Sequence, residues 1–156
     1  MENHTESRRL TAEQLQTWRD YIEVARALDN QMAERMQQTS AVSAADYPIL
    51  LALQEAPENR LRSSALADSV GWQRSRVSHQ LGRMEKRGLI RRETCAADSR
   101  GSEVVLTGQG AAAFKRAAGP HMRDIHELFV DALTPAQMRA AADIAATLRA
   151  HLGEGA

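Results

Sequence analysis

The chain has 156 residues, of which 43% are hydrophobic and 26% are charged. This length is typical of one domain, and the composition excludes both a disordered chain and a membrane-embedded one. The uncharged stretches are too polar to cross a bilayer, and the N-terminal residues form no apolar secretory signal, so we expect a soluble cytoplasmic protein that contacts no membrane. The single cysteine, Cys95, excludes an intramolecular disulfide and a Cys-based zinc finger.

The net charge of zero hides an uneven distribution of charge along the chain. The segment from Arg60 to Arg100 contains ten basic and four acidic residues, a net charge of +6, and the remainder carries −6. Such asymmetry indicates a polyanionic partner for the basic segment, although arginines that only decorate solvated helix faces give the same count.

The N-terminal third predicts two helices. Apolar residues recur every three or four positions from Thr11 to about Gln38, and Thr11 with Gln14 forms a capping box. A helix of this length spans about 42 Å, more than so small a domain needs for its own core, so we expect it to contact another subunit. A second helix is predicted from Ser43 to about Glu55, with a local bend at Pro48 in its second turn and one backbone hydrogen bond lost there.

The central segment predicts a helix, a turn, a helix and a hairpin. A short helix runs from Ser63 to Val70 and ends at Gly71, and a second runs from Gln73 to Arg87 and ends at Gly88, where left-handed dihedral angles are expected. Two short alternating runs, 89–93 and 103–106, predict strands joined by a polar loop. This order of elements is that of a winged helix-turn-helix with a two-stranded wing.

The last third is predicted to be helical. A long helix begins after Thr107, with a kink near its middle at Gly119-Pro120. Another begins after Thr134, with Pro135 at its first position and Gln137 completing a capping box. The apolar residues expected to face inward on this last helix are Met138, Ala141, Ile144 or Ala145, and Leu148.

The helix predicted over 73–87 has two contrasting faces. Val77, Leu81 and Met84 form a stripe expected to be buried. The opposite face has no acid and no large apolar side chain, and its flanks are basic: the exposed set is Ser75, Arg76, Ser78, His79, Gly82, Arg83 and Lys86. Hydroxyl, imidazole and guanidinium groups are the donors and acceptors that read base edges in the major groove. Gly82 indicates either close approach of a partner or a tolerated surface glycine.

The loop between the two predicted strands contains Asp98 and Arg100. An arginine at the tip of a wing suits insertion into a narrow minor groove, where the potential is most negative. In that interpretation Asp98 orients an arginine. The alternative interpretation is a loop that makes no contact with DNA.

Several segments together resemble the MarR (multiple antibiotic resistance regulator) family of bacterial transcription factors. They are Leu66-Ala67, Gly71, the run Ser75-Arg76-Val77-Ser78, the run from Met84 to Arg92, and Asp98-Ser99-Arg100 leading to Val105-Leu106-Thr107. The resemblance covers about residues 11 to 152. It implies a mainly α fold with a small β-hairpin wing, in one domain spanning 1–156: a winged helix-turn-helix region at 43–106, with N- and C-terminal dimerisation helices at 11–40 and 107–152.

The resemblance also implies a function. A homodimer would place two recognition helices in successive major grooves of a pseudo-palindromic operator in double-stranded DNA. The expected DNA-binding residues are Arg74, Ser75, Arg76, Ser78, His79, Arg83, Asp98 and Arg100. Trp72 and Arg74 depart from the family pattern, in which smaller residues or proline are frequent at these positions. We expect a repressor, because dimers of this shape occlude promoters.

Many members of this family release DNA when a small anionic or aromatic ligand fills the crevice between the dimerisation helices and the winged domain. Trp18, Tyr21 and Tyr47 are the candidate residues for such a phenolic or metabolite effector, although aromatic residues at this spacing are more often part of a core. No cofactor or metal is expected: His121 and His126 lie about 140° apart on a helix and need a third element to share an ion.

Two alternatives for a regulator of this fold remain open, and an enzyme is not expected. Cys95 lies near Arg91, Arg92 and Arg100, which favour a reactive thiolate and hence a redox switch, although thiol sensors of the family usually carry their cysteine near the N-terminal helix. The second alternative is that the winged fold serves protein–protein assembly, against which the polar exposed set argues. The sequence contains no phosphate-binding glycine loop, HExxH motif or nucleophile elbow.

Overall fold

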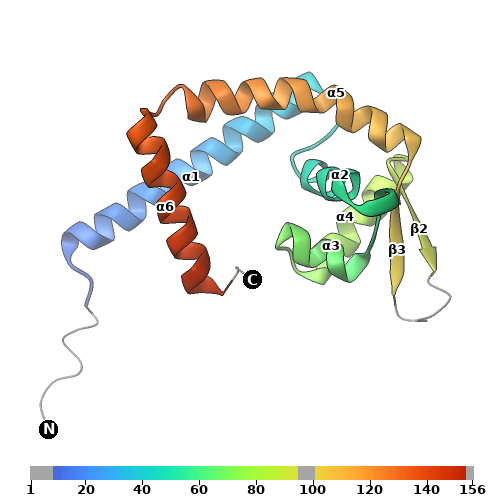
Figure 1. Ribbon diagram of the computed structural model, residues 1–156, viewed down its shortest axis with the longest axis horizontal. Helices are drawn as coiled ribbons and strands as arrows, with labels where there is room; N and C mark the ends of the chain where they lie inside the picture. Colours follow the sequence, from blue (N-terminus) through green and yellow to red (C-terminus); the bar gives the residue numbers. More distant parts are fainter. Residues whose placement is uncertain (1–8, 95–100, 154–156) are drawn as a thin grey trace, which may run out of the picture.

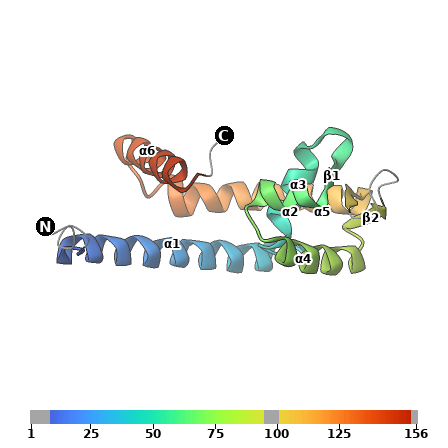
Figure 2. The same cartoon turned by 90° about the horizontal axis from the view of Figure 1, so that it is seen from below.

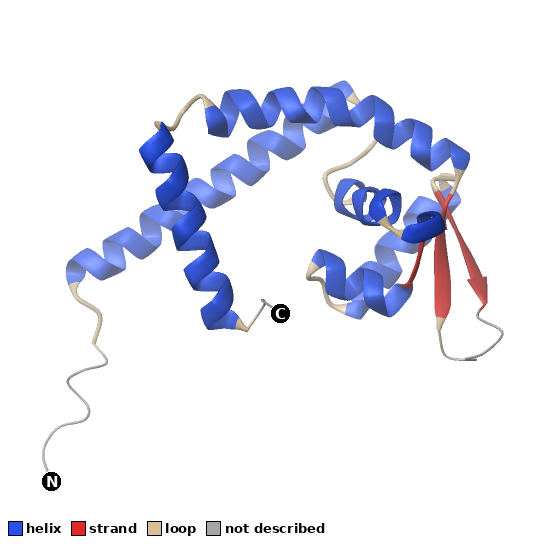
Figure 3. Cartoon of the chain, viewed as in Figure 1, coloured by secondary structure: helices blue, strands red, loops and turns tan. Residues whose placement is uncertain are grey.

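The computed structural model describes residues 9–94 and 101–153 (Figure 1). Helices dominate, and a small sheet lies at one end (Figure 3), so the predicted class, mainly α with a β wing, is confirmed. Helices α1 (Ala12–Thr39), α5 (Gly108–Ile125) and α6 (Pro135–Leu152) form one part of the molecule. The other part contains α2 (Asp46–Glu55), α3 (Ser63–Val70), α4 (Arg74–Lys86) and the sheet.

The long helix α1 is present as predicted, with 28 residues. Its capping box is complete, because Thr11 Oγ1 accepts from the Gln14 amide at 3.1 Å and Gln14 Oε1 accepts from the Thr11 amide at 2.9 Å. Near its C-terminal end, Arg35 donates to Asp124 at 3.0 Å and to Glu127 at 2.7 Å. These ion pairs hold α1 against α5 and the turn that follows it, and Figure 2 shows the two helices one above the other.

The second helix begins three residues later than predicted, close to Pro48. The Tyr47 amide donates to Ser43 O at 3.1 Å, so the chain begins to turn at Ser43, but Pro48 has no N–H with which to continue the pattern. Regular helix therefore begins at Asp46, and Pro48 is the third residue of α2, where a helical N–H has no partner within the helix. The proline therefore affects where regular helix begins.

The wing is part of a three-stranded antiparallel sheet and not a two-stranded hairpin, which corrects the prediction. The strands are β1 (Arg60–Arg62), β2 (Ile90–Thr94) and β3 (Ser102–Leu106), in the spatial order β1-β3-β2. Strand β1 follows a short 3-10 turn, η2 (Pro57–Asn59), and pairs Arg60 with Val105. Three residues are too few to show a period of two, so this strand was not visible in the sequence.

The predicted glycine turns are confirmed. Gly71 ends α3 with φ 66° and Gly88 follows α4 with φ 74°, both in the left-handed region. After Gly88, the Thr107 hydroxyl donates to Gly88 O at 2.6 Å, and the Thr107 Oγ1 accepts from the Gly110 amide at 2.9 Å. The start of α5 is thereby fixed against the end of α4.

The hydrophobic core lies between α2, α3, α4, the sheet and the first half of α5. Helix α5 continues through Gly119 and Pro120, although Pro120 has no backbone N–H to donate, and it is followed by the π-helical turn η3 (His126–Val130). The prediction of an inward apolar stripe on α6 was wrong for the single chain: none of the residues of this fully described helix is buried, and Ile144 and Leu148 are 49% and 43% exposed. No helix within the described ranges has the length and apolar character needed to span a membrane.

Candidate nucleic-acid interface

Helix α4 has the two faces predicted from its sequence. Val77, Leu81 and Met84 are buried in the core. The candidate recognition residues are all exposed: Arg74, Ser75, Arg76, Ser78, His79 and Arg83. Gln80, which the sequence pattern did not single out, is buried beside the apolar stripe. The helix therefore packs one face firmly against the core and presents its polar, basic face to solvent.

Trp72, one of the departures from the family pattern, has a defined role at the start of α4. Its half-buried ring packs against the core, and the guanidinium of Arg76 lies 3.9 Å from the ring centroid. A guanidinium stacked on an indole ring keeps its positive charge and its attraction for anions, but it loses much of its freedom to move. Trp72 thus restrains one of the candidate base-reading side chains.

A basic hollow of about 370 Å³ lies beside α4, between the start of α3 and the root of the hairpin. It is lined by Arg62, Ser63, Ser64, Arg74, Val77, Ser78, Leu81, Arg92, Gly101 and Ser102. The sequence-based selection contained Arg74 and Ser78 but missed Arg62, Ser63, Ser64 and Arg92. The charge count was the available signal for the two arginines, but only the fold brings them beside α4.

The root of the hairpin is held by ion pairs. Arg60 Nη1 lies 3.1 Å from Glu103 and 3.6 Å from Glu93, joining β1 to both strands of the hairpin. Arg92 is 2.8 Å from Glu85, which joins the hairpin to α4. The proposed wing residues Asp98 and Arg100, and also Cys95, lie outside the described residues.

Gly82 has no packing role in the described part of the chain. Apart from the two adjoining residues and the backbone of α4 itself, a Cβ built at this position meets no described atom within 4 Å. The glycine is therefore not required by contacts of α4 with the described elements of its own chain, which leaves both sequence-based interpretations open.

The three candidate effector residues do not lie together within the single chain. Trp18 and Tyr21 lie on α1 with 59% and 51% of their surface exposed, whereas Tyr47 is only 9% exposed. Met36 is the residue of α1 that contacts the core around Tyr47. Trp18 lies eighteen residues before Met36, which is about 27 Å along the helix.

Tyr47 is a core residue at the junction of α2 and α5. Its ring centroid is 5.3 Å from that of Phe114 and 4.3 Å from that of His121. Burial, with a smaller effect of Glu55, raises the pKa of Tyr47, and burial lowers the pKa of His121 against an opposing effect of Asp124. His126 instead lies 3.0 Å from Asp131 at the surface, and no cluster of metal-ligating side chains occurs within residues 9–94 and 101–153.

The exposed basic helix, supported by a sheet at its side, is the arrangement of a winged helix-turn-helix DNA-binding protein. A family model described as MarR family matches residues 42–101. The chain belongs to the MarR family of transcription regulators, and it is therefore a regulator and not an enzyme.

Two solved structures from Streptomyces coelicolor carry this assignment. The MarR family regulator Sco3205, solved in complex with DNA, is 36% identical with a TM-score of 0.85, over 90% of this chain and 88% of its own. AbsC, a MarR family regulator, is 34% identical with a TM-score of 0.85, over 95% of this chain and 99% of its own. No curated protein sequence gives a significant match.

A more distant relative shares the fold. The organohalide-sensing regulator RdhR-CbdbA1625, in its 2,4-dichlorophenol-bound form, is 20% identical with a TM-score of 0.79, over 97% of this chain and 86% of its own.

Proposed function

We propose that the protein is a sequence-specific transcriptional repressor that binds a pseudo-palindromic operator as a homodimer and acts in the cytoplasm, where the bacterial genome lies. The observation that carries this proposal is the exposed polar face of α4 beside the arginine-lined hollow. In the proposed complex α4 lies in the major groove, and Ser75, Arg76, Ser78 and His79 contact base edges and phosphates. The DNA-bound structure of Sco3205 supports this role.

The same proposal assigns roles to the regions of the chain. Residues 43–106 bind DNA, and 11–40 and 107–152 form the dimer interface of a single domain. The arginines around the hollow supply attraction to the phosphate backbone, which positions the protein but carries no sequence information. Arg100 of the wing enters the minor groove, with Asp98 orienting it.

The salt dependence of binding tests this function. We expect the logarithm of the association constant for a duplex to fall steeply and linearly with the logarithm of salt concentration, because each neutralised phosphate releases counterions. Arg100→Ala is expected to weaken operator binding by about 1–3 kcal/mol. Lys115→Ala, an exposed cation on α5, is the matched control and should leave binding unchanged. A flat salt dependence would instead indicate a protein–protein module.

We further propose that a small phenolic or metabolite ligand relieves repression. The dichlorophenol-bound structure of RdhR-CbdbA1625 supports this for a protein of the same fold. Relief requires that the ligand bind one arrangement of the subunits more tightly than the other. A mobility shift with the DNA that flanks the protein's own gene, repeated across a panel of phenols and metabolites, tests it: a compound that lowers operator affinity is the expected result, and a panel without effect contradicts it.

A further inference from the structure

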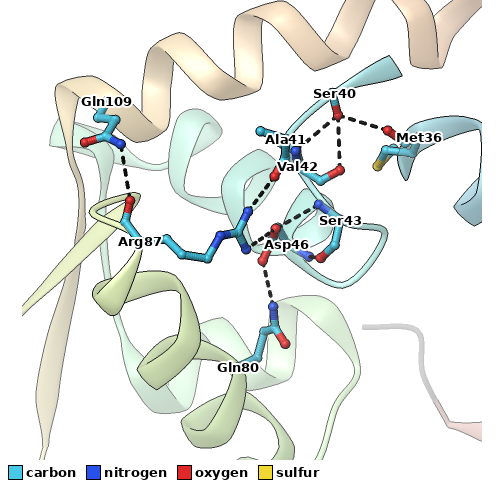
Figure 4. Close-up of polar contacts among 9 residues, drawn as sticks. All are labelled: Met36, Ser40, Ala41, Val42, Ser43, Asp46, Gln80, Arg87 and Gln109. Carbon is cyan, nitrogen blue, oxygen red and sulfur yellow. Dashed lines mark hydrogen bonds and ion pairs between the residues drawn. The ribbon is translucent and has the colours of Figure 1, made fainter. Parts of the chain in front are cut away.

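Asp46 is a fully buried carboxylate at the start of α2, with an exposed fraction of 0%. It accepts three hydrogen bonds from two different parts of the fold (Figure 4). The Ser43 amide donates to it at 2.8 Å, from the linker that joins α1 to α2. Gln80 Nε2 and Arg87 Nη1, both at 2.7 Å, donate to it from α4.

The linker, residues 40–45, is itself held in a defined shape. Ser40 Oγ accepts from the Val42 amide at 3.2 Å and donates to Met36 O at 3.2 Å, and Met36 is the one buried residue of the fully described helix α1. Arg87 Nη2 also donates to Ala41 O. The end of the recognition helix is thus bonded to the linker twice, once directly and once through Asp46 (Figure 4).

The chemistry of this network indicates that it orients α4 more than it adds to the stability of the fold. A carboxylate removed from water is costly unless donors surround it, and well-packed apolar residues often give a core of equal stability. Hydrogen bonds to a charged group are strongly directional, however, whereas apolar contacts are not. Gln80 and Arg87 are seven residues apart, about 10 Å along the helix, so the two bonds together restrict how α4 tilts and slides.

We propose that Asp46 is a positioning residue for operator recognition, which holds α4 in a set orientation relative to the linker and thus to α1. This inference rests on the proposed function, in which α1 belongs to the dimer interface. The spacing of the two recognition helices then depends on how each α4 is attached to its α1. Loosening that attachment leaves attraction to phosphates intact and reduces discrimination between sequences, because only base contacts require exact placement.

The substitution Asp46→Asn tests this proposal. Asparagine has the same shape and still accepts from Gln80, but its amide group faces the donors of Arg87 and Ser43. Because Asp46 is fully buried in the free protein, the change introduces no new contact with DNA. The probes are a duplex enriched from a random library by the wild type and a random-sequence duplex of the same length. We expect Kd for the enriched duplex to rise about tenfold and Kd for the random duplex to change less than about twofold.

Two further variants separate positioning from loss of stability. Gln80→Met removes, from the side of α4, the bond that Asp46→Asn retains, and Gln80 is also buried. The double variant should therefore lose more discrimination than either single variant, because the two changes remove different bonds between α4 and Asp46. Leu53→Ala, at a fully buried apolar residue of α2, is the destabilised control. Its ratio of the two Kd values, corrected for the folded fraction, should equal that of the wild type.

A second readout needs no DNA. Spin labels at Lys86→Cys, in a Cys95→Ser background, report the distance between the two α4 helices of a dimer. We expect a broader distance distribution with Asp46→Asn and an unchanged one with Leu53→Ala. An unchanged Kd ratio together with an unchanged distribution in Asp46→Asn and Gln80→Met would overturn the proposal. A wild type that enriches no duplex contradicts the proposed function instead, and the distances then decide the role of Asp46.

Discussion

Arg76 illustrates how a single side chain gains a function from its neighbour. An arginine on a solvated helix face samples many rotamers, and ordering it on binding costs free energy. In this protein the guanidinium is stacked 3.9 Å from the ring centroid of Trp72, which is itself packed against the core. The sequence marked Trp72 only as a departure from the family pattern, and the structure explains it as a support for Arg76.

Removing the ring while keeping an apolar side chain tests this role. We expect Trp72→Leu to weaken operator binding by about 0.5–1 kcal/mol, the usual contribution of an exposed cation–π pair, and to weaken it less than Arg76→Ala. Trp72→Phe, which keeps an aromatic face, should recover part of the loss. Fluorescence anisotropy titrations measure Kd for the wild type and the three variants, and equal binding by Trp72→Leu and wild type would contradict the role.

His121 is a second residue whose surroundings change its chemistry. Its ring contacts Tyr47, and its Nδ1 is buried with no hydrogen-bond partner among the described atoms. Burial lowers the pKa of His121, and the nearby Asp124 only partly offsets this. The folded state therefore favours the neutral imidazole.

This lowered pKa predicts a loss of stability in mild acid. The unfolded chain binds a proton at His121 below about pH 6.5, while the folded chain resists protonation until a lower pH. The free energy of unfolding should therefore decline as pH falls below about 6.5 and stop declining below the folded pKa. Denaturant unfolding at fixed protein concentration between about pH 5 and 8 measures it, and His121→Gln should flatten the profile. Parallel profiles for the two proteins would contradict the prediction.

At the scale of elements, the junction between α4, β2 and α5 depends on one close approach. A Cβ built at Gly110 would lie 1.9 Å from Leu89 O, a backbone atom that cannot move aside like a flexible side chain. The same turn carries the Thr107 hydroxyl bonds to Gly88 and Gly110. Only glycine allows the first turn of α5 to reach this position.

We expect Gly110→Ala to lower the free energy of unfolding by about 1–3 kcal/mol or more, the usual cost of forcing extra volume into a packed site. Gly108→Ala, two residues earlier, is the matched control: its Cβ meets no described atom within 4 Å, so it should be neutral or slightly stabilising. Thermal unfolding of both variants measures the two changes in stability. Equal melting temperatures would mean that the close approach relaxes without cost.

Most of the elements were predictable because their signals are local. The capping boxes at Thr11 and Thr134, and the left-handed glycines after α3 and α4, are determined by neighbouring residues, and all are confirmed. The start of the second helix was predicted three residues too early because the effect of a proline depends on where it lies relative to the first turn. Strand β1 was missed because its partner, β3, lies more than forty residues away in sequence.

At the scale of the whole molecule, the single chain leaves large apolar side chains uncovered on α1 and α6. Trp18, Tyr21, Val24, Ile144, Leu148 and Leu152 are each at least 43% exposed. An exposed apolar surface of this kind marks an interaction site in a folded protein. It supports the proposed dimer, in which a second copy covers these helices.

Placing charge on this surface should separate the subunits. We expect Ile144→Glu combined with Leu148→Glu to give a monomer by light scattering and to weaken operator binding by about a hundredfold or more, because binding through two linked recognition helices is lost. Gln54→Glu, at an exposed position of α2, is the charge control and should remain dimeric. A double variant that stays dimeric would place the interface elsewhere.

Periodicity, caps and charge clustering, read from the residues alone, identified the long helices, the winged order of elements and the exposed face of α4, because each depends on residues close together in the chain. Contacts between distant residues required the folded molecule. Asp46 meets Gln80 and Arg87 across thirty-four and forty-one positions, and Arg62 and Arg92 join Arg74 around one hollow. The same folding places Trp18 and Tyr21 far from Tyr47 and turns the apolar stripe of α6 outward, because burial is decided by which elements pack together.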